Sequence, residues 1–264
     1  VGTGGDSLGT FNVSTAASFV AAGAGATVAK HGNRSVSSSS GSADVLEQAG
    51  ANLNLNADQV AQVIERAGVG FMFAPMHHSA MKYAIGPRKE MGVRTLFNVL
   101  GPLTNPAQVK RQVIGVFEAG LTTTLANVFR NLGSEHTLVV HSDDGMDEIS
   151  VCANTQITEA TPEKVQNFLI RPEQFGIQKA SIEELVVANS AESLSVIDAV
   201  LAGQSGAPRD IVVLNAGAGI YVSGLVDSLA EGVAAARASI DSGKALAAKN
   251  AYVIATQAFG DGKN

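Results

Sequence analysis

The chain has 264 residues, of which 45% are hydrophobic and only 16% charged, against roughly 25% charged residues in ordinary soluble domains. This composition excludes a disordered chain, and the length suffices for one large domain or two small ones. A net charge of −6 and an aromatic share of 5% without tryptophan argue against binding to nucleic acid. No apolar run approaches the roughly 18 residues of a membrane span, and the single cysteine fits a reducing cytoplasm. We therefore expect a cytoplasmic protein that binds neither nucleic acid nor membranes.

Strand-like and helical patterns alternate along the first part of the chain. A helix of small residues is expected over residues 14–24, and a buried strand over 26–29 ends at Lys30. Two further helices are expected, one opened by Asp44 at capping-box spacing from Glu47 and one capped by Asp58. The apolar run at 69–73 predicts the next strand.

The pattern is less regular between Pro75 and Pro106, and the alternation then resumes. We expect strands at 112–117, 137–141 and 211–214, a helix at 121–132, a small meander or hairpin within 148–172, and helices toward the end. Strands that alternate with helices predict an α/β fold with a central, mostly parallel sheet flanked by helices.

Several motifs of other enzyme classes are absent from the sequence. It has no G-x-x-x-x-G-K-[ST], no H-E-x-x-H, no C-x-x-C and no G-x-S-x-G. The pairs Gly23-x-Gly25 and Gly217-x-Gly219 lack the third glycine of a dinucleotide fingerprint. A Rossmann dehydrogenase is therefore disfavoured.

The segment Gly2-Thr3-Gly4-Gly5-Asp6 is the first candidate binding loop. Three glycines in four positions let backbone N–H groups converge on an anion without obstruction by Cβ atoms. Asn12-Val13-Ser14-Thr15 follows at the predicted start of a helix, which is itself an anion site. A tight turn followed by an ordinary helix cap explains the same residues equally well.

The second candidate loop begins with Lys30-His31-Gly32-Asn33-Arg34, directly after a predicted strand, where α/β folds place ligands. Six serines follow within residues 35–42. A solvated serine-rich linker is the alternative, but a linker rarely joins a strand to a capped helix in so few residues. We favour a second loop that binds phosphate or ribose oxygens.

An acidic cluster, residues 143–148, follows the predicted strand at 137–141. In isolation, a solvated acidic turn is the better explanation of the cluster. Beside two anion-binding loops the balance changes, because carboxylate oxygens suit Mg²⁺ and several phosphate oxygens in one site usually require a divalent ion. Arg88 and Arg94 are a weaker set, because an arginine there could bind a substrate carboxylate or lie on the surface of a helix.

Taken together, these segments resemble the anthranilate phosphoribosyltransferases. V-G-T-G-G-D, N-V-S-T, V-A-K-H-G-N-R-S-V-S-S, R-T-L-F-N-V-L-G-P-L-T-N-P and G-M-D-E occur here in the order and approximate spacing of that family. The resemblance extends over essentially all 264 residues, including L-N-A-G-A at 214–218. It implies a nucleoside phosphorylase-like α/β fold with the remnant of a small helical domain. The implied reaction transfers the phosphoribosyl group of 5-phosphoribosyl 1-pyrophosphate (PRPP) to anthranilate, a step of tryptophan biosynthesis.

The resemblance also implies a set of site residues, a Mg²⁺ cofactor and a homodimer. Contacts to PRPP are expected from Gly2, Gly5, Asp6, Thr10, Asn12, Val13, Ser14, Thr15, Lys30, His31, Gly32, Asn33, Arg34, Ser35, Val36, Ser37, Ser38 and Ser42. Contacts to anthranilate are expected from Gly2, Asn33 and Arg88, and Mg²⁺ ligands from Ser14, Asp147 and Glu148. No general acid or base is assigned, because the aryl amine is already nucleophilic.

Members of this family carry a helical segment before the glycine loop, and it completes a small helical domain. We therefore expect residues 1–264 to be the catalytic α/β domain of a longer protein, and residues 75–106 to pack with that segment.

Two other functions stay open at this point. A pyrimidine nucleoside phosphorylase shares the fold, but it uses free phosphate and needs no metal-binding pair such as Asp147 and Glu148. A non-catalytic, nucleic-acid-binding relative on the same scaffold would have lost loop or metal residues and gained basic surface.

Overall fold

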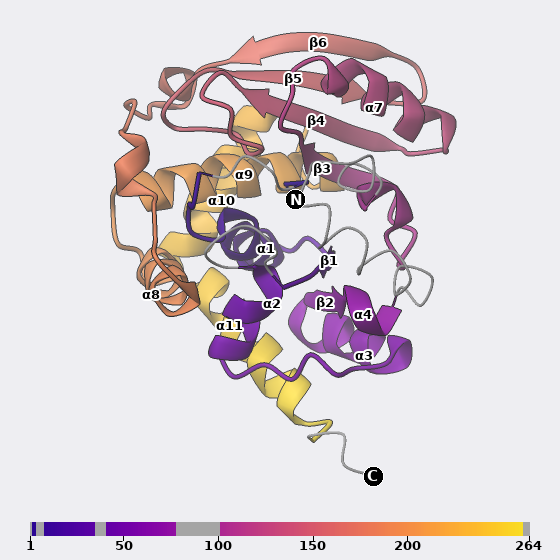
Figure 1. Ribbon diagram of the computed structural model, residues 1–264, viewed down its shortest axis with the longest axis vertical. Helices are drawn as coiled ribbons and strands as arrows, with labels where there is room; N and C mark the ends of the chain where they lie inside the picture. Colours follow the sequence, from indigo (N-terminus) through magenta and orange to yellow (C-terminus); the bar gives the residue numbers. More distant parts are fainter. Residues whose placement is uncertain (1, 4–7, 35–40, 78–100, 261–264) are drawn as a thin grey trace, which may run out of the picture.

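The strands form two sheets in a computed structural model that describes residues 2–3, 8–34, 41–77 and 101–260 (Figure 1). β1 (Val28–Gly32) pairs in parallel with β2 (Val69–Phe73). A four-stranded sheet has the order β3 (Arg111–Gly115), β4 (His136–Ser142), β5 (Thr155–Ala160) and β6 (Val165–Ile170). The β3–β4 pair is parallel, whereas β4–β5 and β5–β6 are antiparallel.

Helices cover both faces of the four-stranded sheet, and successive residues of β4 therefore pack into two different apolar clusters. Val139 packs with Leu125 and Phe129 of α7, whereas Leu138 and Val140 face the main core, against which α9 packs. The described helices are α1 (Val13–Gly23), α2 (Ser42–Gln48), α3 (Ala57–Ala67), α4 (Ala74–His77), α7 (Leu121–Asn131), α8 (Ser190–Leu201), α9 (Ala207–Ser223), α10 (Leu229–Asp241) and α11 (Lys244–Gln257). Short 3₁₀ turns lie at Pro102–Thr104, Pro172–Phe175 and Ile182–Glu184. The expected α/β fold with helices flanking a sheet is confirmed.

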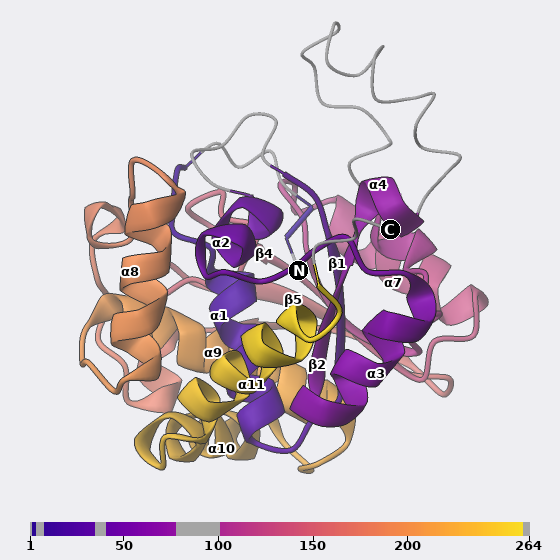
Figure 2. The same cartoon turned by 90° about the horizontal axis from the view of Figure 1, so that it is seen from below.

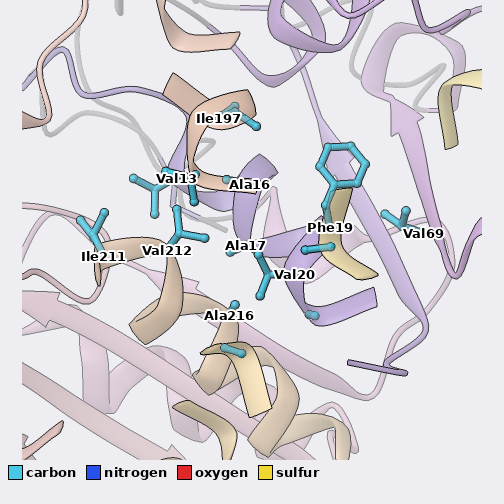
Figure 3. Close-up of a cluster of buried hydrophobic side chains, with 14 of the residues drawn as sticks. Val13, Ala16, Ala17, Phe19, Val20, Val69, Ile197, Ile211, Val212 and Ala216 are labelled. Atoms are coloured by element: carbon cyan, nitrogen blue, oxygen red, sulfur yellow. The ribbon is translucent and has the colours of Figure 1, made fainter. Parts of the chain in front are cut away.

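The main core is built around the contact between α1 and α9. Val13, Ala16 and Val20 of α1 lie beside Val212 and Ala216 of α9 (Figure 3). The small residues of both helices let their axes approach closely. Helix α11 packs against α1 and α3 (Figure 2), and α10 packs against α9. None of the helices in the described part of the chain is long and apolar enough to cross a membrane.

The strand predicted at 211–214 is wrong, because these residues lie inside helix α9. All four are at most 1% exposed. A helix buried on every side has apolar residues around its whole circumference, so its sequence shows no helical period and resembles a buried strand.

Two predicted helix caps are also displaced. Helix α3 begins at Asn56, whose side chain accepts the backbone N–H of Gln59 at 2.9 Å, whereas Asp58 lies in the first turn. Helix α2 begins after Gly41, and the Asp44 carboxylate accepts the N–H of Gly41 at 3.0 Å. In each case the carboxylate lies near the helix N-terminus, which its charge stabilises. The expected hairpin within 148–172 is confirmed as β5–β6.

Candidate active site

Polar groups gather at the carboxyl ends of β1, β3 and β4, near the start of α1. The Lys30 ammonium on β1 donates a hydrogen bond to the hydroxyl of Ser14, with 2.9 Å between Nζ and Oγ. Lys30 is 6% exposed and Asp147, which follows β4, is 5% exposed. Two segments that are far apart in the sequence therefore bring a cation and a carboxylate into one buried place.

Burial lowers the pKa of Lys30 to about 8, because an ammonium loses its hydration in the interior. The carboxylates of Glu148 and Asp147 act in the opposite direction and raise that pKa. Both carboxylates are thus close enough to Lys30 to stabilise its charge. This electrostatic coupling is consistent with a shared site of Lys30, Asp147 and Glu148, which stays a prediction.

The glycine loop is attached to the sheet beside Asp147. The N–H of Thr3 donates to the carbonyl of Gly115 at 3.0 Å, and Gly2 forms a parallel bridge with Gly115. A Cβ atom on Gly2 would lie 2.4 Å from Asp147 Oδ1, and one on Gly115 would lie 1.5 Å from the Asp147 carbonyl oxygen. Glycine at both positions lets the loop, β3 and Asp147 meet without displacing the side chain or the backbone of Asp147. Gly5 and Asp6 lie outside the described residues.

Sequence reasoning missed Gly115. A signal was available, since an isolated glycine inside a predicted strand indicates close approach of another backbone. The partner, Asp147, was not deducible from that pattern.

The acidic cluster divides into carboxylates with different roles. Asp144 accepts the N–H of Met146 at 3.1 Å and the hydroxyl of Ser150 at 2.5 Å, so it stabilises the turn. Asp143 accepts a hydrogen bond from the side-chain amide of Asn154 at 3.1 Å. Asp147 instead lies against the glycine loop.

The start of α1 is fixed from both sides. The Asn12 side chain accepts the N–H of Thr15 at 3.2 Å, and the Asn12 N–H donates to the hydroxyl of Ser193 at 2.9 Å. Val13 and Thr15 are buried, at 2% and 1% exposure. Asn12 and Ser14 are half-buried. Thr10 pairs with Val186 in an antiparallel bridge.

In the second loop, Arg34 is bound to α2. Its guanidinium pairs with Glu47, 2.6 Å between Nη2 and Oε1, and with Asp44 at 3.4 Å. It also lies over the ring of Phe73, 5.4 Å from the centroid. The hydrogen bond with Glu47 is the main cause that raises the Arg34 pKa. Contact between Arg34 and PRPP stays a prediction.

Other predicted residues of this loop are distributed around β1 and α2. Asn33 is exposed and accepts the N–H of Arg34 at 2.8 Å, His31 and Gly32 end β1, and Ser42 begins α2. Residues 35–38 lie outside the described part of the chain, as does Arg88 with most of the segment 75–106.

The donor set fits Mg²⁺. Ser14 offers a hydroxyl, and Asp147 and Glu148 offer carboxylate oxygens, which are the hard ligands that this ion prefers. Within the described residues, no group of three or more His, Cys, Asp or Glu side chains could hold a metal ion. Mg²⁺ usually binds through one or two carboxylates together with substrate phosphates and water, so this small set is sufficient.

A match to a protein-family model defines the class to which the chain belongs. Residues 1–246 match the model described as "Glycosyl transferase family, a/b domain", so the chain is a glycosyl transferase. More specifically, the chain belongs to the anthranilate phosphoribosyltransferase family. The anthranilate phosphoribosyltransferase of Hydrogenovibrio crunogenus is 54% identical over 258 residues, which cover 98% of this chain and 76% of that protein. That of Thioalkalivibrio sulfidiphilus is 58% identical over 244 residues, 92% of this chain and 72% of the relative.

Solved structures agree with this assignment. The anthranilate phosphoribosyltransferase of Thermus thermophilus superposes with a TM-score of 0.91 at 41% identity, covering 97% of this chain and 76% of that one. The Saccharomyces cerevisiae enzyme in complex with PRPP and Mg gives a TM-score of 0.88 at 28% identity, covering 97% and 72%. The resemblance inferred from the sequence motifs is thereby confirmed.

Proposed function

We propose that this chain transfers the phosphoribosyl group of PRPP to the amine of anthranilate. The products are N-(5-phosphoribosyl)anthranilate and pyrophosphate, and Mg²⁺ is held by Ser14, Asp147 and Glu148. The observation that carries this assignment is the convergence of the Lys30 ammonium, the Ser14 hydroxyl and two carboxylates beside a glycine loop attached to β3. Relatives named anthranilate phosphoribosyltransferase and a yeast enzyme that binds PRPP and Mg support it.

In this reaction the amine nitrogen forms a bond to the anomeric carbon, and the bond from that carbon to the pyrophosphate oxygen breaks. The departing pyrophosphate takes the bonding electrons, and the amine loses a proton. Positive charge on the sugar and negative charge on the leaving group grow together in the transition state. Stabilisation of the leaving group is therefore the main requirement, and bound Mg²⁺ supplies positive charge for it.

Lys30 contributes a second positive charge in a place from which water is excluded. A buried ammonium acts on a nearby phosphate through a low local dielectric, so its attraction exceeds that of a surface lysine. Backbone N–H groups of the glycine loop and of the α1 N-terminus orient the donor oxygens. Gly2, Asn33 and Arg88 are proposed to hold anthranilate, and their contribution is proximity and orientation.

Three wider features belong to the same proposal. The enzyme works in the cytoplasm as a homodimer, in keeping with its single cysteine and with the family's implied dimer. Its partners are small molecules, since a net charge of −6 disfavours nucleic acid. Residues 1–264 act as a catalytic domain, and residues 75–106 pack with further helices.

The test is the loss of anthranilate fluorescence on addition of PRPP and Mg²⁺. Glu148→Ala should reduce the rate at least 100-fold, because one of two carboxylate ligands is removed. Asp143→Asn is the matched control, since this carboxylate belongs to the same loop but contacts Asn154, and it should keep most of the activity. Turnover that is insensitive to EDTA would contradict the metal assignment.

A further inference from the structure

Asn215 is a polar residue in the middle of the buried helix α9. It lies on α9 between Leu214 and Ala216, which are each 1% exposed, and is itself 7% exposed. Burial of a side-chain amide costs free energy unless its donor and acceptor are both used. The hydrogen bonds of Asn215 therefore have to offset the cost of burying its amide in this apolar helix.

Both ends of the amide bind the backbone of one residue, Ile149. Asn215 Oδ1 accepts the N–H of Ile149 at 2.9 Å, and Nδ2 donates to the carbonyl of Ile149 at 2.9 Å. Nδ2 also donates to the carbonyl of Ile211 at 2.8 Å. The orientation of the amide is fixed, since the opposite one would set its NH₂ against an N–H and its oxygen against two carbonyls.

Ile149 directly follows the carboxylate pair. On the opposite side of the chain, the hydroxyl of Ser142 donates to the carbonyl of Glu148 at 2.8 Å, and the N–H of Ser150 donates to the hydroxyl of Thr155 at 3.1 Å. The backbone from Glu148 to Ser150 is thus bound both to the sheet and to α9. Helix α9 runs beside β3 and β4 (Figure 1), so this attachment connects the acidic loop to the core.

We propose that Asn215 is a positioning residue that fixes Asp147 and Glu148 for Mg²⁺. The inference rests on the proposed function, because it assumes that these two carboxylates bind the metal. Mg²⁺ demands near-ideal geometry, and groups that orient its ligands typically change metal affinity 10- to 100-fold when they are removed. Asn215 acts through the backbone of Ile149 and does not itself touch metal or substrate.

The test compares Asn215→Leu with Tyr221→Phe, a control on the same helix that removes a hydrogen bond to Glu159. The first measurement is amide hydrogen exchange at Ile149 without Mg²⁺ or substrates, which should become at least tenfold faster in Asn215→Leu only. The second is the Mg²⁺ concentration for half-maximal rate at saturating PRPP and anthranilate. It should rise at least tenfold in Asn215→Leu, while kcat at saturating Mg²⁺ stays within about threefold of the unchanged protein.

Asn215→Gln keeps both the donor and the acceptor of the amide on a longer side chain and should give an intermediate midpoint; it also serves if Asn215→Leu does not fold. A midpoint within twofold of the unchanged protein in both variants, with Glu148→Ala strongly shifted, overturns the positioning role alone. If Glu148→Ala leaves the midpoint unchanged, the carboxylate pair is not the metal site. The proposed function then fails as assigned, and the inference fails with it.

Discussion

Lys30→Met should stabilise the fold and abolish the reaction. Lys30 carries a positive charge at 6% exposure, and burial lowers its pKa from 10.5 to about 8 despite two nearby carboxylates. Methionine has a similar length and no charge, so it fills the same space without the cost of burying an ammonium. Under the proposed function, donor binding should be lost because the cation proposed to bind the phosphate is removed.

The magnitude follows from the pKa difference. A fall of about 2.5 units corresponds to about 3 kcal/mol, at 1.36 kcal/mol per unit. Because the folded-state pKa lies below the unfolded value, the unfolded chain binds more protons between about pH 8 and 10.5. The cost of the charge is therefore fully present below pH 8 and is relieved as the pH rises toward 10.5.

The assay is urea unfolding of both proteins from pH 7 to 9.5. At pH 7 the free energy of unfolding of Lys30→Met should exceed that of the unchanged protein by up to about 3 kcal/mol, and this difference should shrink above pH 8. Lys249→Met is the control, because Lys249 pairs with the half-exposed Asp198, and it should bring no gain. Destabilisation of Lys30→Met by more than about 1 kcal/mol at pH 7 would refute the reasoning.

Two other substitutions test the surroundings of the site and the distant end of the sheet. Gly115→Ala places a Cβ 1.5 Å from the Asp147 carbonyl oxygen, so it should lower the rate, and it should lower the free energy of unfolding by about 2–4 kcal/mol. Gly120→Ala is the control and should change neither, because its Cβ would meet only Glu118 Oε1 at an ordinary contact distance of 3.9 Å. Glu159 accepts a hydrogen bond from His136 Nε2 at 2.7 Å, the main cause that lowers its pKa to about 2. The stabilisation of the fold by the ionised Glu159 carboxylate is present above about pH 4.5 and is lost as the pH falls toward 2. Glu159→Gln should therefore lower the free energy of unfolding by about 2 kcal/mol at pH 7 and flatten its pH dependence between pH 4.5 and 2. An unchanged slope of that pH dependence would contradict this.

Local patterns in the sequence predicted helix α3 and strand β2. Helix α3 has apolar residues on one face only, and β2 is a short apolar run ended by turn residues, so each carries a clear period or boundary. Helix α9 carries none, because every side of it is buried. The strand predicted at 211–214 ended just before Asn215, so it gave no indication of a contact between Asn215 and Ile149.

The family motifs predicted the candidate site residues that they contain, but not the residues that hold those site residues in place. Gly115 and Asn215 act on Asp147 and Ile149 through contacts between distant segments. Such contacts depend on how elements pack, which neither composition nor spacing reports. Likewise, the pairing of Arg34 with Glu47 becomes visible only when α2 is placed beside β1.

The order of synthesis gives these long-range contacts a further consequence. Asn12 is bonded to Ser193, 181 positions later, and Ile149 to Asn215, 66 positions later. At about 5–20 residues per second, a ribosome needs roughly 10–40 s to travel from Asn12 to Ser193. Throughout that interval the start of α1 lacks its attachment to α8, whereas the acidic loop waits only for the 66 residues up to Asn215, roughly 3–13 s. The acidic loop of a nascent chain therefore gains its attachment to the core only after α9 has left the ribosome and docked.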